Sequence, residues 1–142
     1  MLHNFLPVND GELLGLRFST NGGSTYDAGA SDYSLVSLAD SSLATADNRQ
    51  GGYAAVWLGG GNIDSLASSG GLNGSVHLYG TTNASARTHC SFESSSVNSD
   101  ISSIWSTFGH ASRVTAQDTD AIRLIFNTGN IASGSWALYG FN

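Results

Sequence analysis

The sequence predicts an all-β protein, an antiparallel, jelly-roll-like β-sandwich of about seven or eight strands in one domain spanning residues 1–142. Three observations predict this class: short runs in which apolar and polar residues alternate, glycine- and serine-rich turns between them, and a charged fraction of only 11%. A helical bundle would expose many more Lys, Glu and Arg side chains. Parallel α/β architecture is excluded because no segment reads as a crossover helix.

The first strand is predicted at residues 12–20, where Leu14, Leu16 and Phe18 alternate with small or polar residues and give one buried and one wet face. The Asn-Gly-Gly-Ser sequence at 21–24 predicts a hairpin turn, with a return strand beginning at residues 25–26.

Residues 33–38 predict the next strand, and residues 40–52 have no clean period and predict a loop. Residues 53–58 are apolar on both faces, as in a strand covered on both sides.

The pattern Gly-Ser-x-x-Leu-Tyr-Gly occurs twice, at residues 74–80 and 134–140, each time downstream of Gly-Asn-Ile. Each copy predicts a short strand between tight turns. The second copy predicts the closing strand at residues 135–141, with Leu138 facing inward and Tyr139 on the opposite face.

Three more strands are predicted, at residues 87–93, 101–108 and 121–126. The middle segment has apolar residues at helical offsets of three, four and seven, but its serines and threonine suit a strand equally. We predict a strand there, because a helix would be the only one in the chain.

The charge balance excludes several partners. The chain has no lysine, and five arginines face eleven carboxylates, for a net charge of −6. Nucleic acids and anionic membrane surfaces are therefore not expected partners. No apolar stretch approaches the roughly 20 residues of a transmembrane helix, and the amino end has no signal-peptide pattern, so neither membrane insertion nor secretory export is expected.

No metal, cofactor or catalytic site is predicted. The four histidines lie in four separate segments, and the aspartates in polar loops do not follow calcium-loop spacing. The chain lacks a nucleophile elbow, a phosphate loop and a marked pair of carboxylates. Cys90 is expected to be a small buried residue, since the neighbouring His89 points to the opposite face of the strand.

Aromatic residues are the remaining candidates for binding. Trp57 and Trp136 lie in runs that predict burial, whereas Tyr26, Tyr33 and Tyr53 lie near loop ends. These three tyrosines are the candidate residues for an exposed platform that would stack on sugars.

Residues 17–33, 97–100 and 120–140 resemble a family of small bacteriophage virion domains, found alone or at the carboxyl end of tail and fibre proteins. The closing Gly-Asn-Ile-Ala-Ser-Gly, followed by Leu-Tyr-Gly, is the most specific part, and the resemblance covers nearly the whole chain. Such domains usually start with a further strand before the segment at residues 7–11, and this sequence departs from the pattern because it begins almost at that segment. We therefore expect either that an edge strand is lost or that a neighbouring chain supplies it.

The resemblance implies a non-enzymatic virion protein, assembled in the host cytoplasm, that contacts other virion proteins. We expect a homo-oligomer, a trimer, in the tail or tail fibre that presents loops to a glycan on the host surface. Two alternatives stay open: a capsid decoration protein that cements the shell, and a glycan-degrading enzyme.

Overall fold

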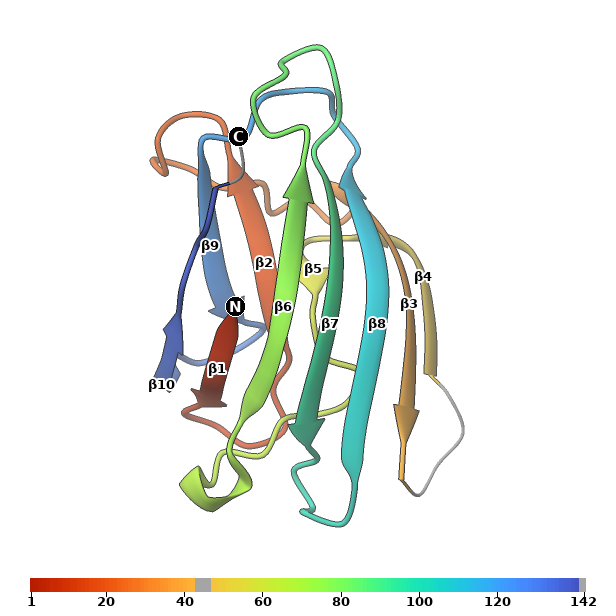
Figure 1. The fold of residues 1–142 in the computed structure, drawn as a ribbon, viewed down its shortest axis with the longest axis vertical. Helices are drawn as coiled ribbons and strands as arrows, with labels where there is room; N and C mark the ends of the chain where they lie inside the picture. The colour runs from red at the N-terminus through yellow and green to blue at the C-terminus, as the bar shows by residue number, and fades with distance from the viewer. Residues whose placement is uncertain (43–46, 141–142) are drawn as a thin grey trace.

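In the computed structural model, which describes residues 1–42 and 47–140, ten strands form two antiparallel sheets packed as a β-sandwich (Figure 1). The larger sheet has the order β10-β1-β6-β7-β8-β3-β4 and the smaller one β5-β2-β9. The strands are β1 Leu2–Pro7, β2 Leu14–Ser19, β3 Tyr33–Ser41, β4 Asp47–Tyr53, β5 Val56–Trp57, β6 Leu72–Tyr79, β7 His89–Val97, β8 Ile104–Arg113, β9 Ala121–Phe126 and β10 Ile131–Trp136. The predicted fold class is confirmed, with ten strands in place of seven or eight.

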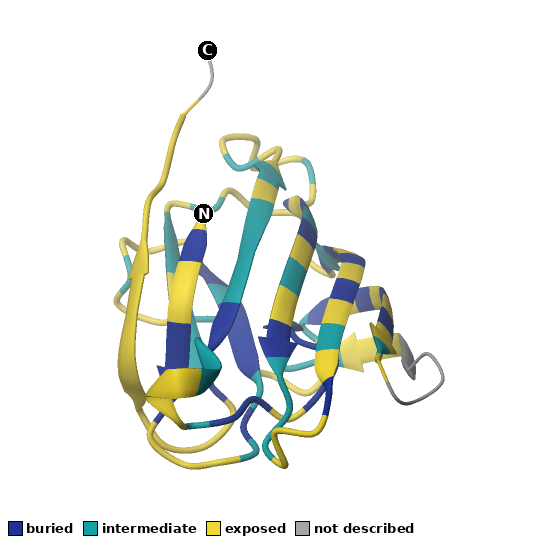
Figure 2. Ribbon diagram, turned by 60° about the horizontal axis from the view of Figure 1, so that its bottom comes forward, coloured by how far each residue is buried: buried dark blue, intermediate teal, exposed yellow. Residues whose placement is uncertain are grey.

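The core fills the space between the two sheets and is built from the inward-facing positions of both. Its most buried large side chains are Tyr33, Phe18, Leu14, Leu16, Leu58, Ile63, Leu72 and Val56. Figure 2 shows the resulting alternation of buried and exposed residues along the strands of the larger sheet. This alternation is what a sheet with one covered face requires.

Strand β3 alternates as predicted, but its apolar residues are divided between the two faces. Tyr33 and Leu35 face the core, whereas Val36 and Leu38 are 53% and 48% exposed on the outer face. The solvent-exposed face of the larger sheet therefore carries apolar side chains.

The predicted hairpin at residues 21–24 is wrong in its second half. A tight turn is present, and the Ser19 hydroxyl accepts hydrogen bonds from the backbone N–H groups of Asn21 and Gly23 at 3.2 and 3.0 Å. No return strand pairs with β2 within the described residues. Strand β9 pairs along one edge of β2, from Leu14↔Phe126 to Ser19↔Ala121, and β5 pairs with the other edge at Gly15 and Leu16. A partner more than a hundred positions away leaves no trace in the local pattern.

The loop predicted at residues 40–52 is also wrong in part. The end of β3 and the whole of β4 lie there, and the two strands pair in continuous register from Tyr33↔Tyr53 to Ala39↔Asp47. Residues 43–46 of that predicted loop lie outside the described residues. The apolar strand predicted at 53–58 is divided between the end of β4 and the short β5.

The ambiguous segment at residues 101–108 is a strand, as predicted, but β8 begins only at Ile104 and continues to Arg113. Ile101 has a φ of 52° and lies in the preceding turn. As a central strand paired with both β3 and β7, β8 gains more from sheet pairing than its helical spacing offers.

The first copy of the repeated motif forms most of β6, as predicted, but the second departs from its prediction. Strand β10 ends at Trp136, in the middle of the motif. Leu138 and Tyr139 are 65% and 71% exposed and Trp136 is 57% exposed, so the predicted inward position of Leu138 and burial of Trp136 are wrong. The expectation of a strand that is lost ahead of residues 7–11, or supplied by a neighbouring chain, is wrong. Strand β1 occupies that place and lies between β10 and β6 in the sheet.

Candidate functional site

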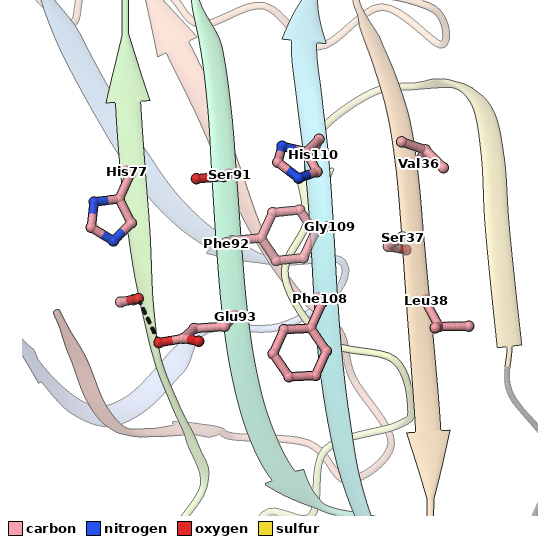
Figure 3. Close-up of a pocket in the computed structure, with 11 residues that line it drawn as sticks. Val36, Ser37, Leu38, His77, Ser91, Phe92, Glu93, Phe108, Gly109 and His110 are labelled. Atoms are coloured by element: carbon pink, nitrogen blue, oxygen red, sulfur yellow. Dashed lines mark hydrogen bonds between the residues drawn. The ribbon is translucent and has the colours of Figure 1, made fainter.

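A groove of about 460 Å³ lies on the outer face of the larger sheet, across strands β6, β7, β8 and β3 (Figure 3). The side chains that line it from outward-facing positions are Val36, Leu38, Ser75, His77, Ser91, Glu93, Phe108 and His110. Because all four strands are paired to their neighbours in this region, only side chains project into the groove.

Sheet register arranges these side chains in two rows. One row runs His77, Ser91, His110 and Val36, since His77 pairs with Ser91, Ser91 with His110, and His110 with Val36. The other row runs Ser75, Glu93, Phe108 and Leu38 by the same register. Neighbours in a row are one strand spacing apart, about 4.8 Å.

The β6 and β7 half of the groove is polar. Ser75 donates a hydrogen bond from Oγ to Glu93 Oε1 at 3.2 Å, which holds the carboxylate over the sheet. The imidazoles of His77 and His110 stand on either side of Ser91 (Figure 3). Together these groups offer both donors and acceptors to a hydroxyl-rich ligand.

The β8 and β3 half is apolar. Phe108 is 59% exposed and lies between Glu93 and Leu38 in its row. The exposed ring, together with the exposed side chains of Val36 and Leu38, makes this half of the groove a candidate contact surface.

The floor of the groove depends on Gly109. A Cβ at this position would lie 2.2 Å from Phe92 Cζ and 2.9 Å from Ser37 Cβ, well inside contact distance. The Phe92 ring occupies that space beneath β8 and is 4% exposed. Glycine therefore lets Phe92 seal the core directly below the groove.

The three candidate tyrosines do not form a platform. Tyr33 is fully buried, so its predicted exposure is wrong: its hydroxyl accepts a hydrogen bond from Phe18 N at 2.8 Å, and burial raises its pKa to about 12. Tyr53 is half-buried against the core. Tyr26 lies in the loop after β2, with its ring under the Arg123 guanidinium at 5.7 Å.

Arg113 gives the loop residue Asp27 a structural role. Its guanidinium is 1% exposed and donates to Asp27 Oδ2, with Nε at 2.7 Å, as well as to Asp118 O and Gln117 Oε1. It also forms a salt bridge of 2.5 Å with Asp27. This network ties the end of β8 to two loops and engages the Asp27 carboxylate in a structural role.

Cys90 is buried, as predicted, and burial raises the pKa of its thiol to about 12. A thiol with such a pKa is not a nucleophile at neutral pH. Neither His3 nor His89 lines the groove.

Across residues 1–42 and 47–140, no group of three or more His, Cys, Asp and Glu residues could hold a metal ion. Within the same ranges, no helix is long and apolar enough to cross a membrane. The chain matches no protein-family model, no curated protein and no solved structure.

The sequence does not predict the groove, because the groove joins four strands that lie between residues 36 and 110. The only local signal was the exposed pattern of β3, where Val36 and Leu38 occupy the face opposite Tyr33. Phe108, His77 and His110 come together only through the order of strands in the sheet.

Proposed function

We propose that this protein is a non-enzymatic structural protein of a bacteriophage virion, a tail or tail-fibre component whose outer sheet face attaches to a glycan on the host surface. The observation that carries the binding half of this proposal is the groove, in which an exposed ring stands beside imidazole, hydroxyl and carboxylate groups. A sugar ring presents an apolar face to an aromatic side chain and hydroxyls to polar ones, so both halves of the groove have a use.

The resemblance of residues 17–33 and 120–140 to small phage virion domains supports the virion half. A fold with a single reduced, buried cysteine is compatible with assembly in the host cytoplasm. The binding surface, however, is a sheet face and not the loops that the sequence favoured.

Binding is favoured over hydrolysis by the charges in the groove. Of the described residues that line it, Glu93 is the one carboxylate. A glycosidase ordinarily needs two carboxyl groups about 5–10 Å apart. The groove is thus suited to hold a polysaccharide and not to cleave it.

A capsid decoration protein is the second candidate, and one observation favours it. All six residues of the edge strand β10 are exposed, so this edge is open to neighbouring chains (Figure 2). A cement protein would use such an edge to join capsomers.

Two measurements on the encoding phage test the proposal. Gold-labelled antibody against the chain should decorate the tail of intact particles, and label spread over the icosahedral shell would favour the decoration protein instead. The purified chain should bind host cells and lose that binding after the surface polysaccharide is stripped. A chain that ignores host cells before and after stripping would refute the attachment role.

A further inference from the structure

The outer face of the smaller sheet carries two arginines in paired positions. Arg17 of β2 pairs in register with Arg123 of β9, and both alternate with core-facing residues such as Leu16 and Leu124. Directly opposite residues on antiparallel strands have their Cβ atoms roughly 4.5–5.5 Å apart. The two side chains therefore start side by side, on the face of the sandwich that lies opposite the groove.

Neither Arg17 nor Arg123 forms a salt bridge with any described residue. Two aspartates in adjoining loops have other partners, since Asp27 pairs with Arg113 and Asp120 accepts a backbone hydrogen bond at 2.9 Å. Like charges directly opposite each other destabilise a sheet. In a chain where eleven carboxylates face five arginines, a pair of arginines without an acidic partner is the arrangement expected of a site for an anion from outside the chain.

Both guanidinium groups are held in place. Arg17 donates a hydrogen bond from Nε to Ala54 O at 2.9 Å, and its Nη atoms have no partner among the described residues. The Arg123 guanidinium lies over the Tyr26 ring, 5.7 Å from the ring centre. That ring is itself packed closely, because a Cβ on Gly23 would lie 2.8 Å from Tyr26 Oη. Donors held in this way lose less side-chain entropy when they bind a ligand.

A row of apolar residues lies beside the two arginines. Trp57, Gly15 and Ile125 pair across the three strands of the smaller sheet, two residues along from Arg17 and Arg123. The Trp57 ring lies over Gly15, where a Cβ would be 2.7 Å from Trp57 Cζ3. Because Trp57 is only partly buried, its ring offers an apolar surface about 7 Å along the sheet from the arginine row.

The chemistry of the two rows favours one class of ligand. A guanidinium group binds a planar carboxylate through charge-assisted, bidentate hydrogen bonds. An aromatic ring beside it accepts the apolar face of a sugar ring. A polysaccharide whose sugars carry carboxylates, such as one built from uronic acids, would use both rows.

We propose that the outer face of the smaller sheet is a second glycan subsite, in which Arg17 and Arg123 bind the carboxylates of an acidic polysaccharide. This inference rests on the proposed attachment function for the source of the sugar, and it adds the charge of the glycan, which the groove does not specify. The net charge of −6 repels a polyanion from the molecule as a whole, so binding depends on these two arginines and weakens as salt rises.

Calorimetric titration of the full chain with an oligomer of galacturonic acid tests the subsite, and the methyl ester of the same oligomer is the matched ligand. The ester keeps every sugar ring and loses the charges. We expect the acid to bind at low salt and the ester to bind about tenfold more weakly or less tightly still. Added salt should weaken the binding of the acid, because screening shortens the range of the attraction.

Substitution of single arginines locates the binding. Arg123→Gln should lower the affinity for the acid about tenfold, and so should Arg17→Gln, because each removes one cation from the subsite. Arg87→Gln is the matched control, since it makes the same change of net charge at an exposed arginine outside the smaller sheet and should leave binding unchanged. Circular dichroism of each variant checks that the fold is kept.

The proposal fails if the acid does not bind, if the ester binds as tightly as the acid, or if Arg87→Gln weakens binding as much as Arg123→Gln. It also fails if a polyglutamate peptide binds more tightly than the sugar oligomer, which would assign the two arginines to an acidic segment of another protein. Phe108→Ala, in the groove, should bind the acid as the wild type does, so failure of this subsite and failure of glycan binding in the groove are distinguishable.

Discussion

The groove and a second hollow, the slot of about 550 Å³ between β6 and residues 138–140, both border β6, and they differ in the chemical groups that line them. In the groove every strand has a paired neighbour, so only the side chains of residues such as Phe108, His110 and Glu93 can meet a ligand. The slot instead has an apolar floor that includes Val76 and Leu78. The groove therefore suits a hydroxyl-rich ligand, whereas the slot presents partly buried apolar side chains.

The same strand borders both hollows because its side chains alternate between two faces. The side chain of His77 stands on the outer face, while its neighbours Val76 and Leu78 belong to the floor of the slot. Changes at His77 should therefore act on the groove, and changes at Val76 or Leu78 should act on the slot.

Replacement of Arg113 should give the largest loss of stability, and it should disturb the slot more than the groove. Its guanidinium holds Asp118 O at 2.8 Å and so fixes the loop that brings Thr119 and Asp120 to the slot. Arg113→Leu should lower the free energy of unfolding by roughly 3 kcal/mol, because Asp27 loses its buried partner. Urea denaturation measures this.

Arg123→Leu is the matched control for that variant. Arg123 is exposed and contacts Tyr26 only through a ring contact at 5.7 Å, so its loss should cost less than about 1 kcal/mol. Equal losses for the two arginines would contradict the role given to the Arg113 network.

Substitutions at one glycine beside each hollow should have different effects on stability. Gly109→Ala places a Cβ 2.2 Å from Phe92 Cζ and should cost roughly 2 kcal/mol through overpacking beneath the groove. Gly140, in the wall of the slot, has no atom within 4 Å of its would-be Cβ, so Gly140→Ala should change stability by less than about 0.5 kcal/mol. Thermal unfolding of both variants gives the comparison, and a neutral Gly109→Ala would mean that Phe92 does not fill that space.

The stability of the fold should decrease at alkaline pH because Tyr33 and Cys90 are buried. Burial raises the pKa of Tyr33 from 10.0 and of Cys90 from 9.0, each to about 12. Above the lower values the unfolded chain loses protons that the folded chain keeps, so stability falls as pH rises, by about 1.4 kcal/mol per pH unit for each group, until pH passes 12. Cys90→Ala should remove the thiol's share, and urea midpoints that stay level from pH 9 to 12 would show that the interior is open to water.

His77→Ala should give the smallest effect of these variants, and that effect should be confined to glycan binding in the groove. Loss of one hydrogen-bonding imidazole should weaken glycan binding about threefold to tenfold, while the fold stays intact because the backbone pairing of β6 is unchanged. His89→Ala is the control, since His89 is exposed on the same sheet but does not line the groove. A His77→Ala chain that binds glycan as tightly as the wild type would show that this imidazole does not contact the ligand.

The sequence correctly predicted the fold class and several strands. Its predictions were wrong where strand pairing depends on residues far apart in the sequence. Alternation predicted β3 and β9, because one covered face imposes a period of two. The repeated Gly-Ser-x-x-Leu-Tyr-Gly predicted two similar strands. The first copy forms most of β6 within the larger sheet, whereas the second continues past the end of the edge strand β10. Identical letters differ in burial because their neighbours differ.

The candidate site shows the same limit more strongly. Tyr33 was a reasonable candidate near a loop, but the T-shaped packing of its ring on Phe18 and the bond from Phe18 N hold it in the core. The groove residues lie far apart in sequence and meet only through the strand order β6-β7-β8-β3. Without that order, no local pattern marks Phe108 as a binding residue.

Binding of wild-type and Phe108→Ala protein to an array of purified bacterial surface polysaccharides tests the central claim most directly. The wild-type chain should bind one class of polysaccharide, and the variant, with its fold confirmed by circular dichroism, should bind at least tenfold more weakly because the stacking surface is gone. Equal binding by the two proteins, or no binding by the wild type, would contradict the assignment of the outer sheet face to glycan attachment.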